Sequence, residues 1–118
     1  MRLSPSASLP LTQVLRAAIE CDDPVVYMEH KGLWPVEGEV SDTAEALPIG
    51  KARVARPGTD LTIVTWSKMV HESVEAAEVL AGEGIDVEVI DLRTLWPWDE
   101  AAVFDSVART GNALVVHE

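Results

Sequence analysis

Leu61-Thr62-Ile63-Val64-Thr65-Trp66 is a run rich in β-branched residues that lies between Asp60 and Ser67. Its length, its composition and its polar flanks predict a buried β-strand. A helix is predicted next, because apolar side chains recur at helical spacing while glutamates fall mostly outside that stripe. The stripe consists of Val70, Val74, Ala77, Leu80 and Ala81, and Gly82 and Gly84 are expected to end the helix.

The same alternation continues to the end of the chain. Residues 87–92 predict a second strand and residues 113–116 a third. Between them lies a helix that begins at Asp99 and Glu100 and ends at Gly111, with Arg109 in its last turn and an apolar face of Val103, Phe104 and Val107. Strands that alternate with helices through short loops predict a three-layer α/β fold with a parallel sheet and right-handed crossovers. Both faces of such a sheet need cover, so we expect the domain to continue beyond Glu118.

Two further segments precede this domain. Residues 1–30 predict a helix, with Ser8 as its cap, Pro10 in its first turn and its end near Cys21, followed by a short buried strand at residues 25–28. Residues 31–60 are rich in Gly and Pro and predict an interdomain linker that contains one short strand at residues 52–55. The expected division is therefore 1–30, 31–60 and 61–118.

Composition narrows the class of protein. The chain is 47% hydrophobic and carries a net charge of −11, from 20 acidic and 9 basic residues. This charge argues against nucleic-acid binding, which needs Lys and Arg against the phosphates; it suits either a basic protein partner or a solvated acidic surface. No apolar run approaches the roughly 20 residues of a membrane span, and no secretory signal opens the chain, so a cytoplasmic protein is expected. Cys21 is the only cysteine, which excludes an internal disulfide.

Three segments are candidates for a binding site, each with a structural alternative. Ser67–His71 could offer backbone N–H groups to an anion at a helix start, or form a plain strand-to-helix turn capped by Ser67. His117-Glu118 follows a strand at the edge where α/β folds bind ligands, although an interface or a satisfied histidine is the alternative. Asp91, Arg93, Trp96 and Trp98 could face a ligand; alternatively, Asp91 bonds Arg93 internally while the tryptophans pack an interface. Neither a glycine-rich nucleotide fingerprint nor a metal-binding histidine spacing is present.

Three longer segments, taken together, resemble one protein family. They are residues 17–31, which contain Glu29-His30-Lys31, residues 48–66, which begin Pro48-Ile49-Gly50-Lys51, and residues 87–97, which contain Ile90-Asp91-Leu92-Arg93. They resemble the β subunits of thiamine-diphosphate-dependent 2-oxo acid dehydrogenases, the E1 components. The resemblance covers essentially the whole chain, from the end of the pyrimidine-binding domain into the transketolase-like C-terminal domain. The family usually has a small residue where Trp96 stands, and Leu or Phe where Trp98 stands.

The resemblance implies an activity shared with other chains. In this family an α subunit pairs with the β subunit, thiamine diphosphate lies between them, and the acyl group of a 2-oxo acid passes to lipoamide on E2. The carboxylate and the histidine that serve the cofactor correspond to positions before Met1, and the α subunit holds the diphosphate and magnesium. The resemblance thus implies no catalytic or cofactor-binding residue in this chain, which alone should be inactive. It does imply a potassium site at Ala18, Cys21 and Asp23, next to Ile19, although Asp is common where Cys21 stands.

Two other interpretations stay open on the sequence. One is a non-catalytic α/β binding or assembly module, because the implied catalytic residues lie outside the chain. The other is the matching part of a transketolase-type enzyme, which shares the fold. Under any of them, exposed apolar surface that includes Trp96 and Trp98 predicts a homo-oligomer.

Overall fold

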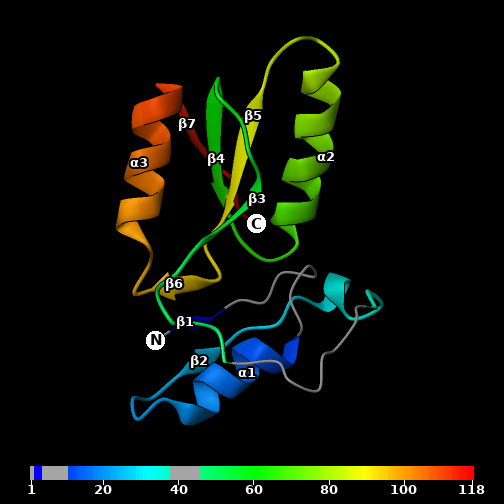
Figure 1. Cartoon of the computed structure of the whole chain (residues 1–118). Coiled ribbons are helices and arrows are strands. Elements are labelled where there is room, and N and C mark those ends of the chain that lie inside the picture. The colour runs from blue at the N-terminus through cyan, green and yellow to red at the C-terminus, as the bar shows by residue number, and fades with distance from the viewer. Residues whose placement is uncertain (1, 4–10, 38–45) are drawn as a thin grey trace.

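The computed structural model describes residues 2–3, 11–37 and 46–118 (Figure 1). Its main sheet contains four strands in the order β3-β5-β4-β7. These strands are β3 (Arg53–Arg56), β4 (Leu61–Thr65), β5 (Val87–Asp91) and β7 (Ala113–Val115). β4 lies inside the sheet and pairs in parallel with both β5 and β7. The predicted α/β class is confirmed.

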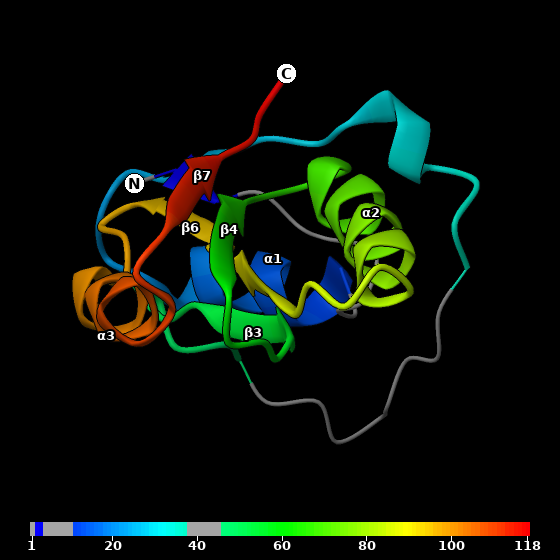
Figure 2. The same cartoon turned by 90° about the horizontal axis from the view of Figure 1, so that it is seen from above.

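Helices cover both faces of this sheet. Figures 1 and 2 show α2 (Met69–Ala81) on one face and α3 (Glu100–Thr110) on the other. Successive strand residues point to opposite faces, so each strand contributes to two apolar clusters. Ile63, Val87 and Val89 pack with Ala77 of α2, whereas Val64, Ile90 and Leu92 pack with Val103 of α3. The result is the three-layer arrangement that the alternating pattern predicted.

The sheet is mixed rather than wholly parallel, because β3 runs antiparallel to β5 with Arg53 opposite Asp91 and Val54 opposite Ile90. This strand was expected inside the linker at residues 52–55. A parallel neighbour needs a long crossover connection, usually a helix, but β3 enters the sheet from a loop and joins β4 through a short turn. An antiparallel strand at the edge of a parallel sheet is the common outcome of such a connection.

A polar network joins α3 to the sheet. Glu88 of β5 is only 3% exposed, and its carboxylate accepts hydrogen bonds from Ser106 and from Arg109 Nη2, the latter at 2.7 Å. Thr62 Oγ1 lies 2.7 Å from both Ser106 Oγ and Thr110 Oγ1. A buried carboxylate is tolerated when it is paired and hydrogen-bonded in this way. The network therefore fixes α3 over β4 and β5.

Both ends of α3 lie where the sequence predicted them. Asp99 is the N-cap and accepts a hydrogen bond from Ala102 N at 3.3 Å, while Gly111 ends the helix at φ 72°. Asp99 also accepts from Ala52 N at 3.2 Å, which holds the approach to β3. Burial alone would raise the pKa of Asp99, but these two backbone hydrogen bonds and the nearby Lys51 ammonium outweigh burial and lower it. One part of this prediction is wrong: Phe104, expected on the apolar face, is 60% exposed, and its ring forms a T-shaped pair with Trp98 at 5.7 Å between centroids.

The start of α2 also differs from the prediction. The N-cap is Lys68, without a side-chain hydrogen bond, instead of Ser67. Ser67 lies one residue earlier and has a φ of 58°, in the left-handed region. Few residues other than glycine adopt this conformation. The end at Gly82 is as predicted.

The N-terminal part packs below the main sheet in Figure 1. α1 (Leu11–Glu20) buries Val14 and Ala17, and its predicted cap at Ser8 and Pro10 lies outside the described residues. A second sheet has the order β2-β1-β6, made of β2 (Val26–Tyr27), β1 (Arg2–Leu3) and β6 (Thr94–Trp96). The predicted burial of residues 25–28 is wrong, since Val26 is 55% exposed. A 3-10 turn, η1 (Lys31–Leu33), follows.

One further finding concerns membranes. Within residues 2–3, 11–37 and 46–118, no helix combines the length and the apolar character needed to cross a bilayer.

Val89→Ala should destabilise the protein by about 2–3 kcal/mol, because it leaves a cavity between β5 and α2. Val89 is 0% exposed, whereas Val79, on the outer side of α2, is 67% exposed. The matched change Val79→Ala should therefore alter the free energy of unfolding by no more than about 0.5 kcal/mol. Urea denaturation followed by circular dichroism measures both values. Equal effects of the two changes would contradict the assigned core.

Candidate functional site

The chain leaves β4 toward one side of the sheet and returns to the other side. β4 connects through α2 to β5, and β5 then connects through α3 to β7, which lies on the opposite side of β4. The carboxyl ends of β4 and β7 therefore lie side by side, with connections that cross opposite faces. In open α/β sheets this switch point is where ligands bind.

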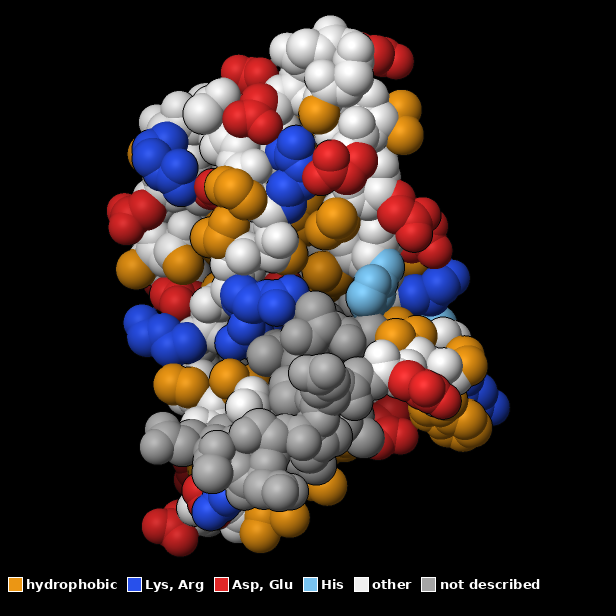
Figure 3. Space-filling view, turned by 45° about the vertical axis from the view of Figure 1, so that its right-hand side comes forward, with side chains coloured by type: hydrophobic (Ala, Val, Ile, Leu, Met, Phe, Trp, Pro, Cys, Tyr) orange, Lys and Arg blue, Asp and Glu red, His pale blue; other side chains and the backbone are white. Residues whose placement is uncertain are grey.

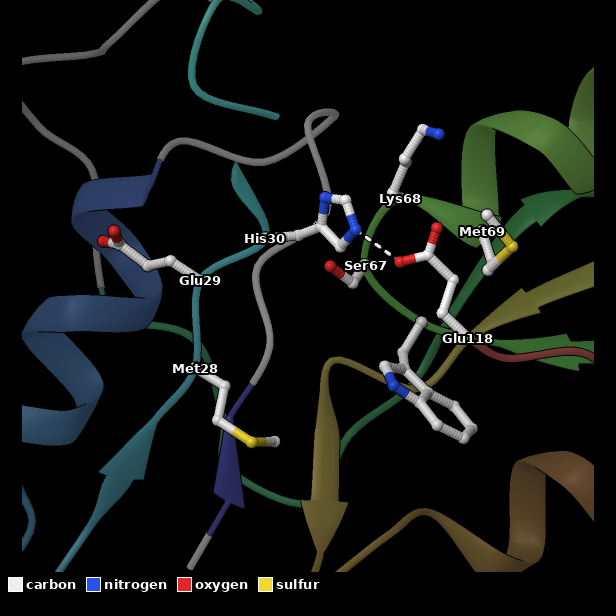
Figure 4. A pocket seen from close by; sticks show the side chains of 8 residues that line it. Met28, Glu29, His30, Ser67, Lys68, Met69 and Glu118 are labelled. Atoms are coloured by element: carbon white, nitrogen blue, oxygen red, sulfur yellow. Dashed lines mark hydrogen bonds and ion pairs between the residues drawn. The ribbon is translucent and has the colours of Figure 1, made fainter. Parts of the chain in front are cut away.

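A cavity of about 220 Å³ lies at this switch point. Figure 4 shows how residues from three parts of the chain meet there. They are Met28, Glu29 and His30 after β2, Trp66, Ser67 and Lys68 between β4 and α2, Met69 at the start of α2, and Glu118 after β7. The cavity is smaller than the roughly 300–1,000 Å³ of pockets that hold drug-sized ligands. It suits a small molecule.

His30 and Glu118 close one side of the cavity. Figure 4 shows the imidazole pointing toward the carboxylate, with Nε2 bonded to Glu118 Oε2. Gly32 N donates a hydrogen bond to His30 Nδ1 at 2.9 Å. Nδ1 must then carry a lone pair, so the ring proton sits on Nε2 and is donated to Glu118. The backbone at Gly32 thus fixes both the tautomer and the direction of the ring.

Another part of the lining combines an aromatic ring with a constrained turn. The Trp66 indole stacks on the His117 ring with 5.5 Å between centroids and 8° between planes. Ser67, only 8% exposed, holds the positive φ described above. Non-glycine residues in this conformation need support from the surrounding structure and are common at binding sites. The turn directs the chain from β4 around the cavity into α2.

The cavity contains residues from two of the segments that the sequence indicated as candidate sites. It is lined by Glu118 and by Ser67, Lys68 and Met69, but not by His71. The His117 ring stacks on Trp66. No pattern in the sequence connected His30 or Met28 with either segment. Both residues follow the short strand β2, and their position after a strand is the only local feature that could have indicated a binding site.

The alternative of an internal Asp91–Arg93 interaction is confirmed. Asp91 is fully buried, and its carboxylate accepts from Arg93 N at 3.3 Å and lies 4.0 Å from Arg93 Nε. Burial lowers the pKa of Arg93, and Arg53 lowers it further, against the opposite effect of Asp91. Trp98 packs partly buried against the α3-side cluster, whereas Trp96 is 65% exposed. Of the two tryptophans, only Trp96 presents a large free surface.

The residues of the implied potassium site lie around the end of α1. Ala18 is half-buried in the last turn, Cys21 is half-buried just after the helix, and Asp23 is exposed. Because α1 ends at Glu20, the carbonyl of Ala18 has no partner within the helix. Carbonyl oxygens at a helix C-terminus are suitable donors for a hard cation. In the part of the chain that the structure describes, no three His, Cys, Asp or Glu side chains gather closely enough to hold a metal ion.

The parallel sheet with its antiparallel edge and the switch-point cavity define an α/β domain of the kind found in transketolase-like enzymes. Residues 50–118 match the family described as "Transketolase, C-terminal domain", and the chain belongs to that family. A solved structure described as "Split gene transketolase, inactive beta4 tetramer" has a similar fold. It superposes with a TM-score of 0.80 at 27% identity and covers 99% of this chain and 38% of that one.

Three other relatives are more similar in sequence than this solved structure. The β subunit of acetoin:2,6-dichlorophenolindophenol oxidoreductase from Cupriavidus necator is 47% identical over 114 residues, covering 97% of this chain and 34% of that protein. The β subunit of 2-oxoisovalerate dehydrogenase from Bacillus subtilis is 41% identical, with coverages of 97% and 35%. The pyruvate dehydrogenase E1 β subunit of the same species is 44% identical, with the same coverages. The relatives are thus E1-type β subunits, of which this chain spans about a third.

Proposed function

We propose that this chain is part of the E1 β subunit of a thiamine-diphosphate-dependent 2-oxo acid dehydrogenase, which oxidatively decarboxylates a 2-oxo acid and transfers the acyl group to lipoamide. The observation that carries the proposal is the similarity to named β subunits over 97% of the chain. It includes the N-terminal segment that carries Glu29-His30-Lys31 as well as the C-terminal sheet. The transketolase-type alternative rests on a fold match at the lower identity of 27%.

Within that subunit, we propose that the chain serves as scaffold. Its buried polar groups, among them Glu88, Ser106 and Asp99, are engaged in holding helices to the sheet. Neither the donors for a magnesium diphosphate nor a glycine-rich phosphate loop are found among the described residues. Thiamine diphosphate and magnesium would be held by other parts of the complex, including the E1 α subunit, and the cofactor would supply the decarboxylation chemistry there.

Further proposals concern location, ions and E2. We propose a cytoplasmic protein, as expected from the sequence, and fractionation of cells would test this.

We propose that the carbonyls around Ala18, Cys21 and Asp23 contribute to a potassium site, so the melting temperature of the protein should be higher in potassium chloride than in choline chloride. The net charge of −11 and the exposed Glu72, Glu75 and Glu78 of α2 support a basic E2 domain as partner. Figure 3 shows acidic side chains interspersed with lysine and arginine on the face that it draws. Such binding should weaken as salt rises.

A chimeric subunit tests the proposed function directly. The matching 115-residue segment of the Bacillus subtilis 2-oxoisovalerate dehydrogenase β subunit would be replaced by this chain and produced with its α subunit. Decarboxylation of the 2-oxo acid should stay within about tenfold of the unmodified enzyme, a change of about 1.4 kcal/mol in the barrier. The same chimera with Val79→Ala is the neutral control. A chimera that folds and binds the α subunit but has no activity would count against the proposal.

The isolated 118-residue chain should not bind thiamine diphosphate. The reason is the absence of a suitable donor set among the described residues. Isothermal titration calorimetry with the cofactor and magnesium should show no saturable heat. Saturable binding at micromolar cofactor would refute the scaffold role.

We expect the chain to self-associate through the surface around Trp96. The similar solved structure of a split-gene transketolase is itself described as a β4 tetramer. Trp96→Ser, which introduces the kind of small residue typical of the family, should shift the chain toward monomer in light scattering at several concentrations, because it removes a large exposed apolar group. Trp34 is similarly exposed, at 68% against 65% for Trp96. Trp34→Ser is therefore the matched control and should leave the association unchanged. A wild-type chain that stays monomeric at high concentration would rule out the interface.

A further inference from the structure

We propose that the switch-point cavity binds a small organic ammonium ion that carries a short apolar body. The geometry of the cavity supports this ligand independently of the proposed function. The cavity brings together the carboxylate of Glu118, the indole of Trp66 and the thioethers of Met28 and Met69.

Glu118 supplies the charge that selects a cation. A carboxylate offers about four lone-pair positions, and the hydrogen bond from His30 Nε2 occupies one of them. Because Gly32 N holds His30 Nδ1 as an acceptor, the imidazole contributes a directed hydrogen bond rather than a positive charge. The hydrogen bond orients the carboxylate, and 50% of the Glu118 side-chain surface stays exposed.

The other charged side chains that line the cavity do not cancel this carboxylate. The Lys68 ammonium lies 3.5 Å from Glu72 Oε1, and Figure 4 shows it pointing away from Glu118. Glu29 also points away from the His30–Glu118 pair in Figure 4, and its sign would in any case favour a cation. The net charge of −11 attracts cations to the protein over a longer range.

The apolar walls suit the rest of such a ligand. Trp66 is the side chain best suited to a cation–π interaction, and Met28 and Met69 provide flexible, polarizable surface that adapts to small alkyl groups. The volume of about 220 Å³ matches a short branched chain. The cavity therefore offers an alkyl ammonium ion both a counter-charge and an apolar surface.

Three ligands of nearly equal shape separate charge recognition from simple filling of the cavity. Isopentylammonium chloride is the probe, with isopentanol as the neutral and isovalerate as the anionic counterpart, each titrated into the 118-residue chain at low salt. Shifts of the Trp66 indole and of the Met28 and Met69 methyl resonances report binding in nuclear magnetic resonance spectra. The ammonium ion should saturate these shifts, and the other two ligands should bind at least about tenfold more weakly. Equal or tighter binding of isovalerate or isopentanol, or no saturable shift with the ammonium ion, would overturn the proposal.

A pair of matched variants tests the role of the carboxylate. Glu118→Gln keeps the shape of the side chain and removes its charge, so it should weaken binding of isopentylammonium about tenfold. Glu75→Gln makes the same change at an exposed position of α2 outside the cavity and should leave the affinity unchanged. Unchanged affinity in Glu118→Gln, or an equal loss in both variants, would overturn the assignment. The comparison of the three ligands needs no variant and decides the matter even if Glu118→Gln fails to fold.

Discussion

The parallel pairing of β4 with both of its neighbours is the interaction on which the rest of the structure depends. Leu61–Thr65 pairs along its whole length with β5 and over Thr62–Val64 with β7. A strand paired on both edges must also be covered on both faces, since a parallel sheet has no face suited to water. α2 and α3 provide that cover, and Ile63 and Val64 supply one contact to each side. The two apolar clusters and the three layers follow from this position of one strand.

The same strand determines where a ligand can enter. The chain first moves to β5 over one face and then to β7 over the other, and the cavity lies between the turn that follows β4 and the residues that follow β7. The segment after β2 closes this cavity with Met28 and His30. The cavity therefore joins the N-terminal part of the chain to the C-terminal sheet, and the His30–Glu118 contact is a direct link between them. Binding there would couple to the relative position of the two parts.

Membership of the transketolase C-terminal domain family accords with a chain whose buried polar residues mostly support structure. Glu88 and Asp99 are buried carboxylates, but each is fully engaged in holding α3 to the sheet. Asp91 is likewise used to hold the left-handed turn at Arg93. At the switch point, by contrast, the Glu118 side chain is 50% exposed and lines a cavity. A ligand can therefore reach a carboxylate there, but not in the core.

Local sequence patterns were sufficient to predict several elements of the main sheet, namely the strands at Leu61 and Val87, the start of α3 at Asp99 and its end at Gly111. These depend on hydrophobic period, caps and glycine, which act within a few residues. Contacts between distant segments determine the antiparallel pairing of β3, the exposure of Val26 and Phe104, and the use of Arg2–Leu3 as a strand between β2 and β6, none of which was predicted. Strands of two to four residues are too short for their hydrophobic pattern to predict which strand they pair with. The contact of His30 with Glu118 joins residues 88 positions apart, and no local periodicity encodes such a distance, because it results from the whole path of the chain around β4.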